Sequence, residues 1–117
     1  MTDSILRNLS KKFAKEIVFL CRALKEKHIE SAIVNQLLRC GTSVGANIHE
    51  AKYAQGTKDF ISKFEIALKE VNETEFWLDL LIDINAISEP EFKSFQKDLI
   101  DLRRMLVSSV TTLKKKT

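Results

Sequence analysis

The chain has 117 residues and a mass of 13.4 kDa, which is the size of one domain covering residues 1–117. It contains only three Gly and one Pro, too few for the many turns of a β-sandwich or barrel, so a few long helices are favoured. The net charge of +3 is too small to establish a nucleic-acid partner, and no run of about 18 apolar residues predicts a membrane span.

The first predicted helix covers residues 4–27. Its apolar residues are spaced 3, 4, 4, 3 and 4 apart and form one stripe: Leu6, Leu9, Phe13, Ile17, Leu20 and Leu24. This spacing is typical of an amphipathic helix that buries one face. The basic residues of the segment lie largely off the stripe, and residues 27–30 are expected to form a turn without Gly or Pro.

The second predicted helix covers residues 31–55 and has an unusual middle. Residues 40–46 are nearly all small, with Gly41 and Gly45 four apart on the same face. Each Gly costs a helix about 1 kcal/mol relative to Ala, so a compensating gain is expected. We interpret the pair as a close approach of another helix, or a kink. A phosphate-binding loop would need a following Lys and a preceding strand, and the sequence predicts neither.

The third predicted helix covers residues 58–85, after Gly56 as a stop and Thr57 as an N-cap. It has two apolar strips. The first consists of Phe60, Phe64, Leu68 (or Ala67), Val71, Leu78 and Leu81, and the second of Phe76, Trp77, Leu80 and Ile84. A monomeric bundle needs only one strip per helix. The second predicts contact with another copy of the chain, although a wider core stripe is the alternative.

The fourth predicted helix covers residues 89–115. Ser88 and Glu91 have the spacing of a capping box, and Pro90 suits a first turn. The spacing 3, 4, 3, 4, 3, 4 links Phe92, Phe95, Leu99, Leu102, Leu106, Ser109 and Leu113. This alternation is the geometry of near-parallel bundle packing. The sequence therefore predicts an all-α, antiparallel up-down-up-down four-helix bundle.

Charge is distributed unevenly along the chain. Residues 1–29 have a balance of +4 and residues 89–117 of +3, whereas residues 57–88 have a balance of −4. The first and last helices are therefore expected to form a basic surface that holds the phosphates of structured RNA or DNA. The candidate residues are Lys11, Lys12, Lys15, Arg22, Arg103, Arg104 and Lys114. The alternative is ordinary solvated helix faces. Because no aromatic residue is interleaved with these side chains, weak sequence specificity is expected.

Residues for catalysis or metal binding are scarce. Neither His lies three residues after a Glu, as a di-iron bundle site requires, and the two Cys are nineteen apart. No catalytic residue, metal or cofactor is expected. Arg22 and His28 match the loose Arg-x4-6-His pattern of HEPN ribonucleases, with Ala23 where that family usually has a polar residue, so such a nuclease stays an alternative.

Five polar residues near the apolar stripes are expected to form a polar clamp between helices: Arg39, Asn47, Glu50, Asn72 and Glu75. A half-buried carboxylate is costly unless it is paired. We therefore expect Arg39 to bind Glu75 or Glu50, and Asn47 to bind Asn72 across the helices.

The cysteines and the N-terminal segment predict a reducing location. Lys11, Lys12 and Lys15 interrupt any signal-peptide pattern, and Cys21 and Cys40 are expected to be buried free thiols. The expected location is the cytoplasm, without membrane attachment.

Two motifs carry a resemblance to a known family. The run LLRCGTSVGANIHEA over residues 37–51, and DFI over residues 59–61 followed by IALKEVNETEFWLDLL over residues 66–81, resemble its two signatures in order and spacing. The family is that of bacterial four-helix-bundle proteins encoded in intervening sequences of large-subunit ribosomal RNA genes. His49 stands where the family more often has Ala or another small residue, so no role is implied for its imidazole.

The resemblance implies an antiparallel bundle that assembles as a homopentameric ring. A related accessory protein of diversity-generating retroelements forms a basic pentameric barrel that binds nucleic acid and a reverse transcriptase. The family has no established catalytic residues. We therefore expect a non-enzymatic protein that self-associates through its second and third helices and binds RNA or DNA. The alternative is a scaffold that binds a protein partner, such as a polymerase, without touching nucleic acid.

Overall fold

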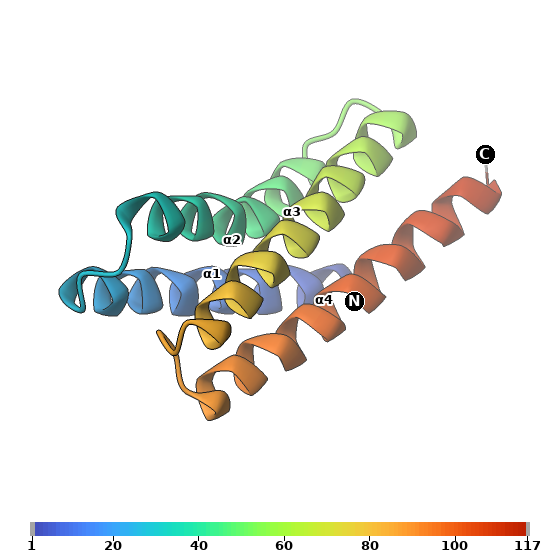
Figure 1. Cartoon of the computed structure of the whole chain (residues 1–117). Helices are drawn as coiled ribbons and strands as arrows, with labels where there is room; N and C mark the ends of the chain where they lie inside the picture. Colours follow the sequence, from blue (N-terminus) through green and yellow to red (C-terminus); the bar gives the residue numbers. More distant parts are fainter. Residues whose placement is uncertain (1, 117) are drawn as a thin grey trace.

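The computed structural model describes the backbone of residues 2–116 and the side chains of residues 4–116, and this part of the chain folds into four α-helices. They are α1 (Thr2–Glu26), α2 (Ser31–Ala51), α3 (Thr57–Asp83) and α4 (Glu89–Lys116). Consecutive helices run antiparallel and form an elongated bundle of 47 × 22 × 20 Å (Figure 1). The expected all-α four-helix bundle is confirmed.

The core runs along the axis of the bundle and takes one stripe from each helix. Its fully buried side chains include Phe13, Ile17 and Leu24 of α1, Val34, Leu37 and Val44 of α2, Phe64, Val71 and Leu81 of α3, and Leu99, Leu102 and Leu106 of α4. Phe13 and Phe95 meet edge to face with ring centroids 5.8 Å apart. Each such large side chain contributes about 1.5–3 kcal/mol by leaving water, so these stripes hold the four helices together.

The small-residue segment of α2 packs closely against α1. A Cβ atom added at Gly41 would lie 2.9 Å from Ile17 Cγ2, and one added at Gly45 would lie 3.3 Å from the carbonyl oxygen of Ser10. The predicted close approach of a second helix is therefore confirmed, and the helix is α1 of the same chain. The two glycines lie about one helical turn apart and bring the α1 and α2 backbones close together at that level of the bundle.

Two of the three turns use a residue in the left-handed region. His28 after α1 has φ 61° and Asn85 after α3 has φ 60°. In each turn the next amide reaches back across the helix end, from Ile29 to the Leu24 carbonyl and from Ala86 to the Leu81 carbonyl. These bonds satisfy carbonyls that a helix end would otherwise leave without a donor. The α1–α2 turn therefore needs neither Gly nor Pro, as predicted.

The α2–α3 turn begins earlier than the sequence predicted, because α2 ends at Ala51 and not at Gln55. The amides of Lys52, Tyr53 and Ala54 each bond to the carbonyl three residues back, which tightens the chain out of the α-helix. Gly56 follows with φ 153°, a conformation that favours glycine, and α3 then starts at Thr57. Gly56 thus ends the turn, and not the helix.

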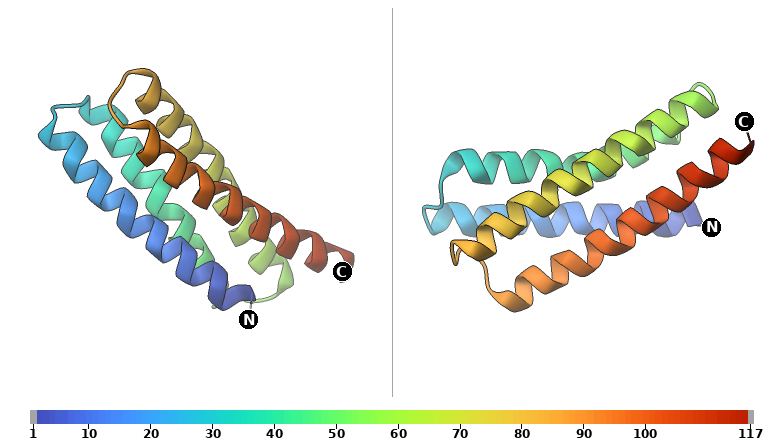
Figure 2. Two further views of the ribbon diagram at one scale, coloured as in Figure 1. Left: turned by 90° about the horizontal axis from the view of Figure 1, so that it is seen from below. Right: turned by 45° about the vertical axis from the view of Figure 1, so that its right-hand side comes forward.

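The α3–α4 turn ends in the predicted capping box. The Glu91 amide donates to Ser88 Oγ at 3.3 Å, and the Ser88 amide donates to the Glu91 carboxylate at 3.1 Å. From this cap α4 runs beside α3, while α4 and α1 diverge toward the chain termini (Figure 2). Within residues 2–116 no helix is both long and apolar enough to cross a membrane.

Candidate nucleic-acid interface

Four of the seven candidate basic residues bind carboxylates of their own chain. Lys12 binds Asp98 at 3.1 Å and Glu16 at 3.3 Å, Arg103 binds Glu75 at 3.1 Å, Arg104 binds Asp101 at 3.3 Å, and Lys114 binds Glu65 at 2.9 Å. The Lys12 ammonium is also held between two carboxylates, and its bond to Asp98 above all raises its pKa. These four charges are compensated before any partner arrives.

The compensation follows from the order of the helices. Because α3 carries the acidic segment and α4 lies beside it, Arg103 and Lys114 of α4 reach Glu75 and Glu65 of α3. Arg103 Nε also donates to Asn72 Oδ1 at 3.2 Å. Four of the seven candidate cations are thus paired with carboxylates of the chain, and three of these four lie on α4.

The remaining three candidates, Lys11, Lys15 and Arg22, are exposed on the outer face of α1. Among the side chains that the structure describes, none of the three has a carboxylate within 4 Å. Arg22 lies over the ring of Phe19, with its guanidinium carbon 5.9 Å from the ring centroid. These three side chains therefore give α1 positive charge that no described carboxylate compensates.

A shallow groove of about 400 Å³ lies between α1 and α2, and we call it the α1/α2 groove. It is lined by Arg7, Asn8, Ser10, Lys11 and Ala14 of α1 and by Thr42, Gly45, Ala46 and His49 of α2. The side chains at the bottom of the groove are small, because Gly45 of α2 packs closely against Ser10 of α1. Its edges carry the cationic side chains of Arg7 and Lys11 and the imidazole of His49.

Arg7 and His49 line this groove, although neither was predicted as a site residue from the sequence. Arg7 lies one turn before Lys11 on α1, and His49 lies one turn after Gly45 on α2, so helical spacing places each beside a residue that was singled out. The available signal was this spacing together with the small residues that bring the two helices into contact.

Aromatic rings lie beside the basic residues in space, although the sequence analysis found none interleaved with them. Tyr53 follows α2, has 69% of its surface exposed, and meets His49 edge to face at 5.7 Å. Lys52 Nζ lies 5.7 Å from the centroid of the Tyr53 ring. A base can therefore stack near the α1/α2 groove, as it does on aromatic platforms of nucleic-acid-binding proteins.

The polar clamp exists with other pairings than expected. Arg39 of α2 binds Glu70 of α3 at 3.0 Å and Glu73 by a second charged hydrogen bond, in place of Glu75 or Glu50. Trp77 Nε1 donates to Glu73 at 3.1 Å. The Arg39 guanidinium, helped by the Trp77 indole, holds the pKa of Glu73 below its ordinary value.

The other predicted clamp residues point elsewhere. Glu50 binds Lys63 at 3.1 Å, and Asn47 Nδ2 donates to the Ser43 carbonyl of its own helix at 2.8 Å. Asn72 and Glu75 both bind Arg103, so the predicted Asn47–Asn72 bond is replaced by a contact between α3 and α4. The reason is rotational: residues 70 and 73 of α3 face α2, whereas 72 and 75 lie about 200° further round and face α4.

The second apolar strip of α3 lies on the surface. Phe76 is 58% exposed and Ile84 is 44% exposed, while Trp77 and Leu80 are half-buried. Phe76 and Trp77 pack edge to face at 5.0 Å. We call these four residues the α3 apolar strip. Trp77 packs against the core of the single chain, whereas Phe76 and Ile84 remain exposed to solvent.

The residues considered for chemistry lie apart from any cluster of ligands. His28 is exposed in the α1–α2 turn, and Arg22 lies on Phe19 on the outer face of α1. Cys21 and Cys40 are free and buried, as predicted. Among residues 2–116 no group of three or more His, Cys, Asp or Glu side chains has the arrangement of a metal site.

Comparisons with known proteins agree with this architecture. A family profile described as 23S rRNA-intervening sequence protein matches residues 2–108. The chain is also similar to the crystal structure of a protein with unknown function from the S23 ribosomal protein family from Bacteroides thetaiotaomicron. The two are 42% identical, with a TM-score of 0.91 over 95% of this chain and 99% of that one. No curated protein matches the chain.

Proposed function

Because the chain belongs to the 23S rRNA-intervening sequence protein family, we propose that it is a non-enzymatic homo-oligomeric bundle that binds structured RNA or DNA along the α1/α2 groove. The observation that supports this proposal is the separation of charge over the fold. Lys93, Arg103, Arg104 and Lys114 of α4 bind carboxylates, whereas among the side chains that the structure describes no carboxylate pairs with Arg7, Lys11 or Lys15 of α1.

A polyanion is the partner that fits this surface. Phosphate oxygens supply the negative charge that the described carboxylates do not bring to Lys11 and Lys15. Because Gly45 and Ala46 are small, a phosphate backbone can approach the two helices without displacing bulky side chains. The groove edges then contact that backbone from both sides.

The same lining predicts what the binding depends on. Asn8 is the one amide among the residues that line the α1/α2 groove, so few side chains there read base edges. The free energy of binding would come mainly from counterion release, and affinity should fall steeply as salt rises. The shape of the nucleic acid, more than its sequence, would decide what is bound.

Self-association belongs to the proposal through the α3 apolar strip. Phe76 lies on α3 and Ile84 directly follows it, and neither lines the α1/α2 groove, so copies joined through the strip would keep their grooves accessible. Several grooves on one assembly raise the effective affinity for a long polyanion. The family resemblance implies five copies, and we propose that number for this chain.

Fluorescence anisotropy with labelled stem-loop fragments of 23S ribosomal RNA tests the proposal. We expect binding at about 50 mM salt that weakens by a factor of ten or more at about 200 mM. The double variant Lys11→Gln/Lys15→Gln should weaken binding at least tenfold. Its matched control is Lys93→Gln/Arg104→Gln, which removes the same charge from two surface residues that already bind Glu89 and Asp101.

Two results would overturn the proposal. The first is an absence of binding at the lower salt concentration, and the second is an equal loss of affinity in both double variants. A protein partner that stays bound after nuclease digestion, in a chain that binds no nucleic acid, would favour the scaffold function in its place.

A further inference from the structure

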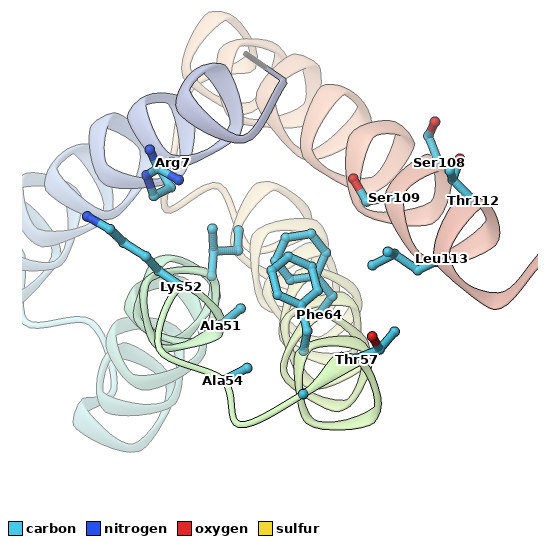
Figure 3. Close-up of a pocket in the computed structure, with 13 residues that line it drawn as sticks. Arg7, Ala51, Lys52, Ala54, Thr57, Phe64, Ser108, Ser109, Thr112 and Leu113 are labelled. Carbon is cyan, nitrogen blue, oxygen red and sulfur yellow. The ribbon is translucent and has the colours of Figure 1, made fainter. Parts of the chain in front are cut away.

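A second and larger hollow opens at the end of the bundle where the chain termini lie, and we call it the end hollow (Figure 3). Its volume is about 770 Å³, within the range of roughly 300–1,000 Å³ that is usual for small-molecule sites. All four helices and the α2–α3 turn contribute to its lining. None of the proposals above uses it, apart from Arg7, which lines the α1/α2 groove as well.

The end hollow exists because α4 lacks bulk where it diverges from α1. Ser109 occupies a position of the α4 apolar stripe that Leu or Phe fills in the earlier turns. Ser108 and Thr112 line the same side, and they too are small and polar. At Ser109 no large side chain therefore projects from α4, and the space beside Leu113 stays open.

The lining of the end hollow combines three kinds of group. Arg7 and Lys52 stand on one side, Ser109 faces Phe64 from the opposite side, and the hydroxyls of Ser108 and Thr112 lie further out on the exposed edge of α4 (Figure 3). Apolar surface also comes from Ile48, Phe60 and Leu113, with the Phe60 and Phe64 rings 4.5 Å apart. No Asp or Glu is among the lining residues.

We propose that the end hollow holds one nucleotide from a single-stranded end of the nucleic acid whose phosphates follow the α1/α2 groove. This inference rests on the proposed function. Arg7 lines both cavities, so a strand leaving the groove passes Arg7 and enters the end hollow without crossing uncharged surface. Arg7 and Lys52 take the phosphate, the half-buried Phe60 ring takes the base, and the Ser109 hydroxyl bonds the sugar.

A nucleotide fits this lining better than a fatty acid does. A fatty acid needs an apolar tunnel with one charged end, whereas the end hollow has two cationic side chains and the Ser109 hydroxyl beside its apolar groups. A nucleotide has an anionic phosphate, a sugar that accepts and donates hydrogen bonds, and a flat base with an apolar face. These three parts match the cations, the Ser109 hydroxyl and the phenylalanine rings.

The test compares two RNA hairpins of the same sequence, one blunt and one with a three-nucleotide 3′ or 5′ overhang ending in 2-aminopurine. We expect one overhang hairpin to bind about tenfold more tightly than the blunt one, the size expected for one stacked base. The 2-aminopurine fluorescence should change on binding. Ser109→Leu, which fills the end hollow, should remove both effects and leave blunt-hairpin affinity unchanged.

Thr111→Leu is the matched control, because it places the same leucine side chain on α4 at an exposed residue that does not line the end hollow. It should keep the tenfold preference. Equal affinity for blunt and overhang hairpins in the unmodified protein would overturn this inference and leave the proposed function standing. Loss of all RNA binding would overturn both. Displacement of the 2-aminopurine end by micromolar decanoate would replace the nucleotide with an amphipathic carboxylate ligand.

Discussion

Arg103 of α4 binds Glu75 of α3, with Nη2 and Oε1 3.1 Å apart. This ion pair, together with the bond from Arg103 Nε to Asn72, joins the acidic helix to the basic helix beside it. The two helices largely neutralise each other, although each carries a net charge of its own. Among the seven candidate cations, the three without a described carboxylate partner, Lys11, Lys15 and Arg22, therefore all lie on α1.

The first prediction concerns Arg103 itself. Arg103→Gln should leave RNA affinity within a factor of two of the unmodified protein, because its charge is already compensated by Glu75. It should lower the free energy of unfolding by up to about 1 kcal/mol, as expected for a partly exposed ion pair. Urea denaturation and anisotropy on the same samples measure both quantities. A tenfold loss of affinity without a loss of stability would assign Arg103 to the binding surface after all.

Periodicity predicted the helices and the core, because apolar residues three and four apart must share a face whatever their neighbours are. It could not predict which polar residues meet, because that depends on which helix lies on each side. Arg39 illustrates this limit: residues 70 and 75 of α3 are both glutamates near the core stripe, and only the rotation of α3 decides that Glu70 faces α2.

The candidate site shows the same division. The small residues around Gly45 predicted a close approach of helices, but not that the approach would leave a basic groove beside it. Ser109 was counted as part of an apolar stripe, and its small size at that position is what opens the end hollow. A cavity forms where a large side chain is replaced by a small one, and the spacing of apolar residues alone does not predict where the remaining side chains leave space.

The second prediction tests the contact between α1 and α2. Gly41→Ala should lower the free energy of unfolding by about 1–2 kcal/mol, because the clash with Ile17 exceeds the gain of about 1 kcal/mol in helix propensity. Ile17→Ala alone should cost about 2–5 kcal/mol. The double variant should cost less than the sum, because removing the Ile17 branch makes room for the new methyl group. Additive costs in chemical denaturation would show that the two positions do not press on each other.

The third prediction is a pH dependence from a buried thiol. Cys21 Sγ lies 3.7 Å from the Val34 carbonyl, and burial raises the pKa of this thiol to about 11 from an ordinary value of 9.0. A group whose pKa is raised by folding stabilises the folded state fully below the unfolded value and loses that contribution above it. The free energy of unfolding should therefore fall by on the order of 2 kcal/mol between pH 9 and 11.

Cys21→Ala isolates this thiol from the lysines that titrate in the same range. The difference in unfolding free energy between the two proteins should shrink as pH rises from 9 to 11. A difference that stays constant over this range would show that Cys21 titrates normally and that another group causes any alkaline loss of stability.

The last prediction concerns self-association through the α3 apolar strip. Phe76→Lys places a charge at the most exposed residue of the strip, and burying that charge against another copy would cost far more than the phenylalanine ring gains. Light scattering should show an assembly for the unmodified protein and a single chain for the variant. Ile5→Lys is the matched control, because Ile5 is an equally exposed apolar residue on α1, and it should leave the assembly intact.

Trp77 gives the same experiment an internal reporter, because it is the single tryptophan and packs on Phe76 at 5.0 Å. Dilution of the unmodified protein should shift Trp77 emission to longer wavelength as the strip becomes exposed to water. The Phe76→Lys protein should show the shifted emission at every concentration. A single chain at high micromolar concentration, with emission independent of dilution, would contradict the proposed assembly, and the strip would then need another partner.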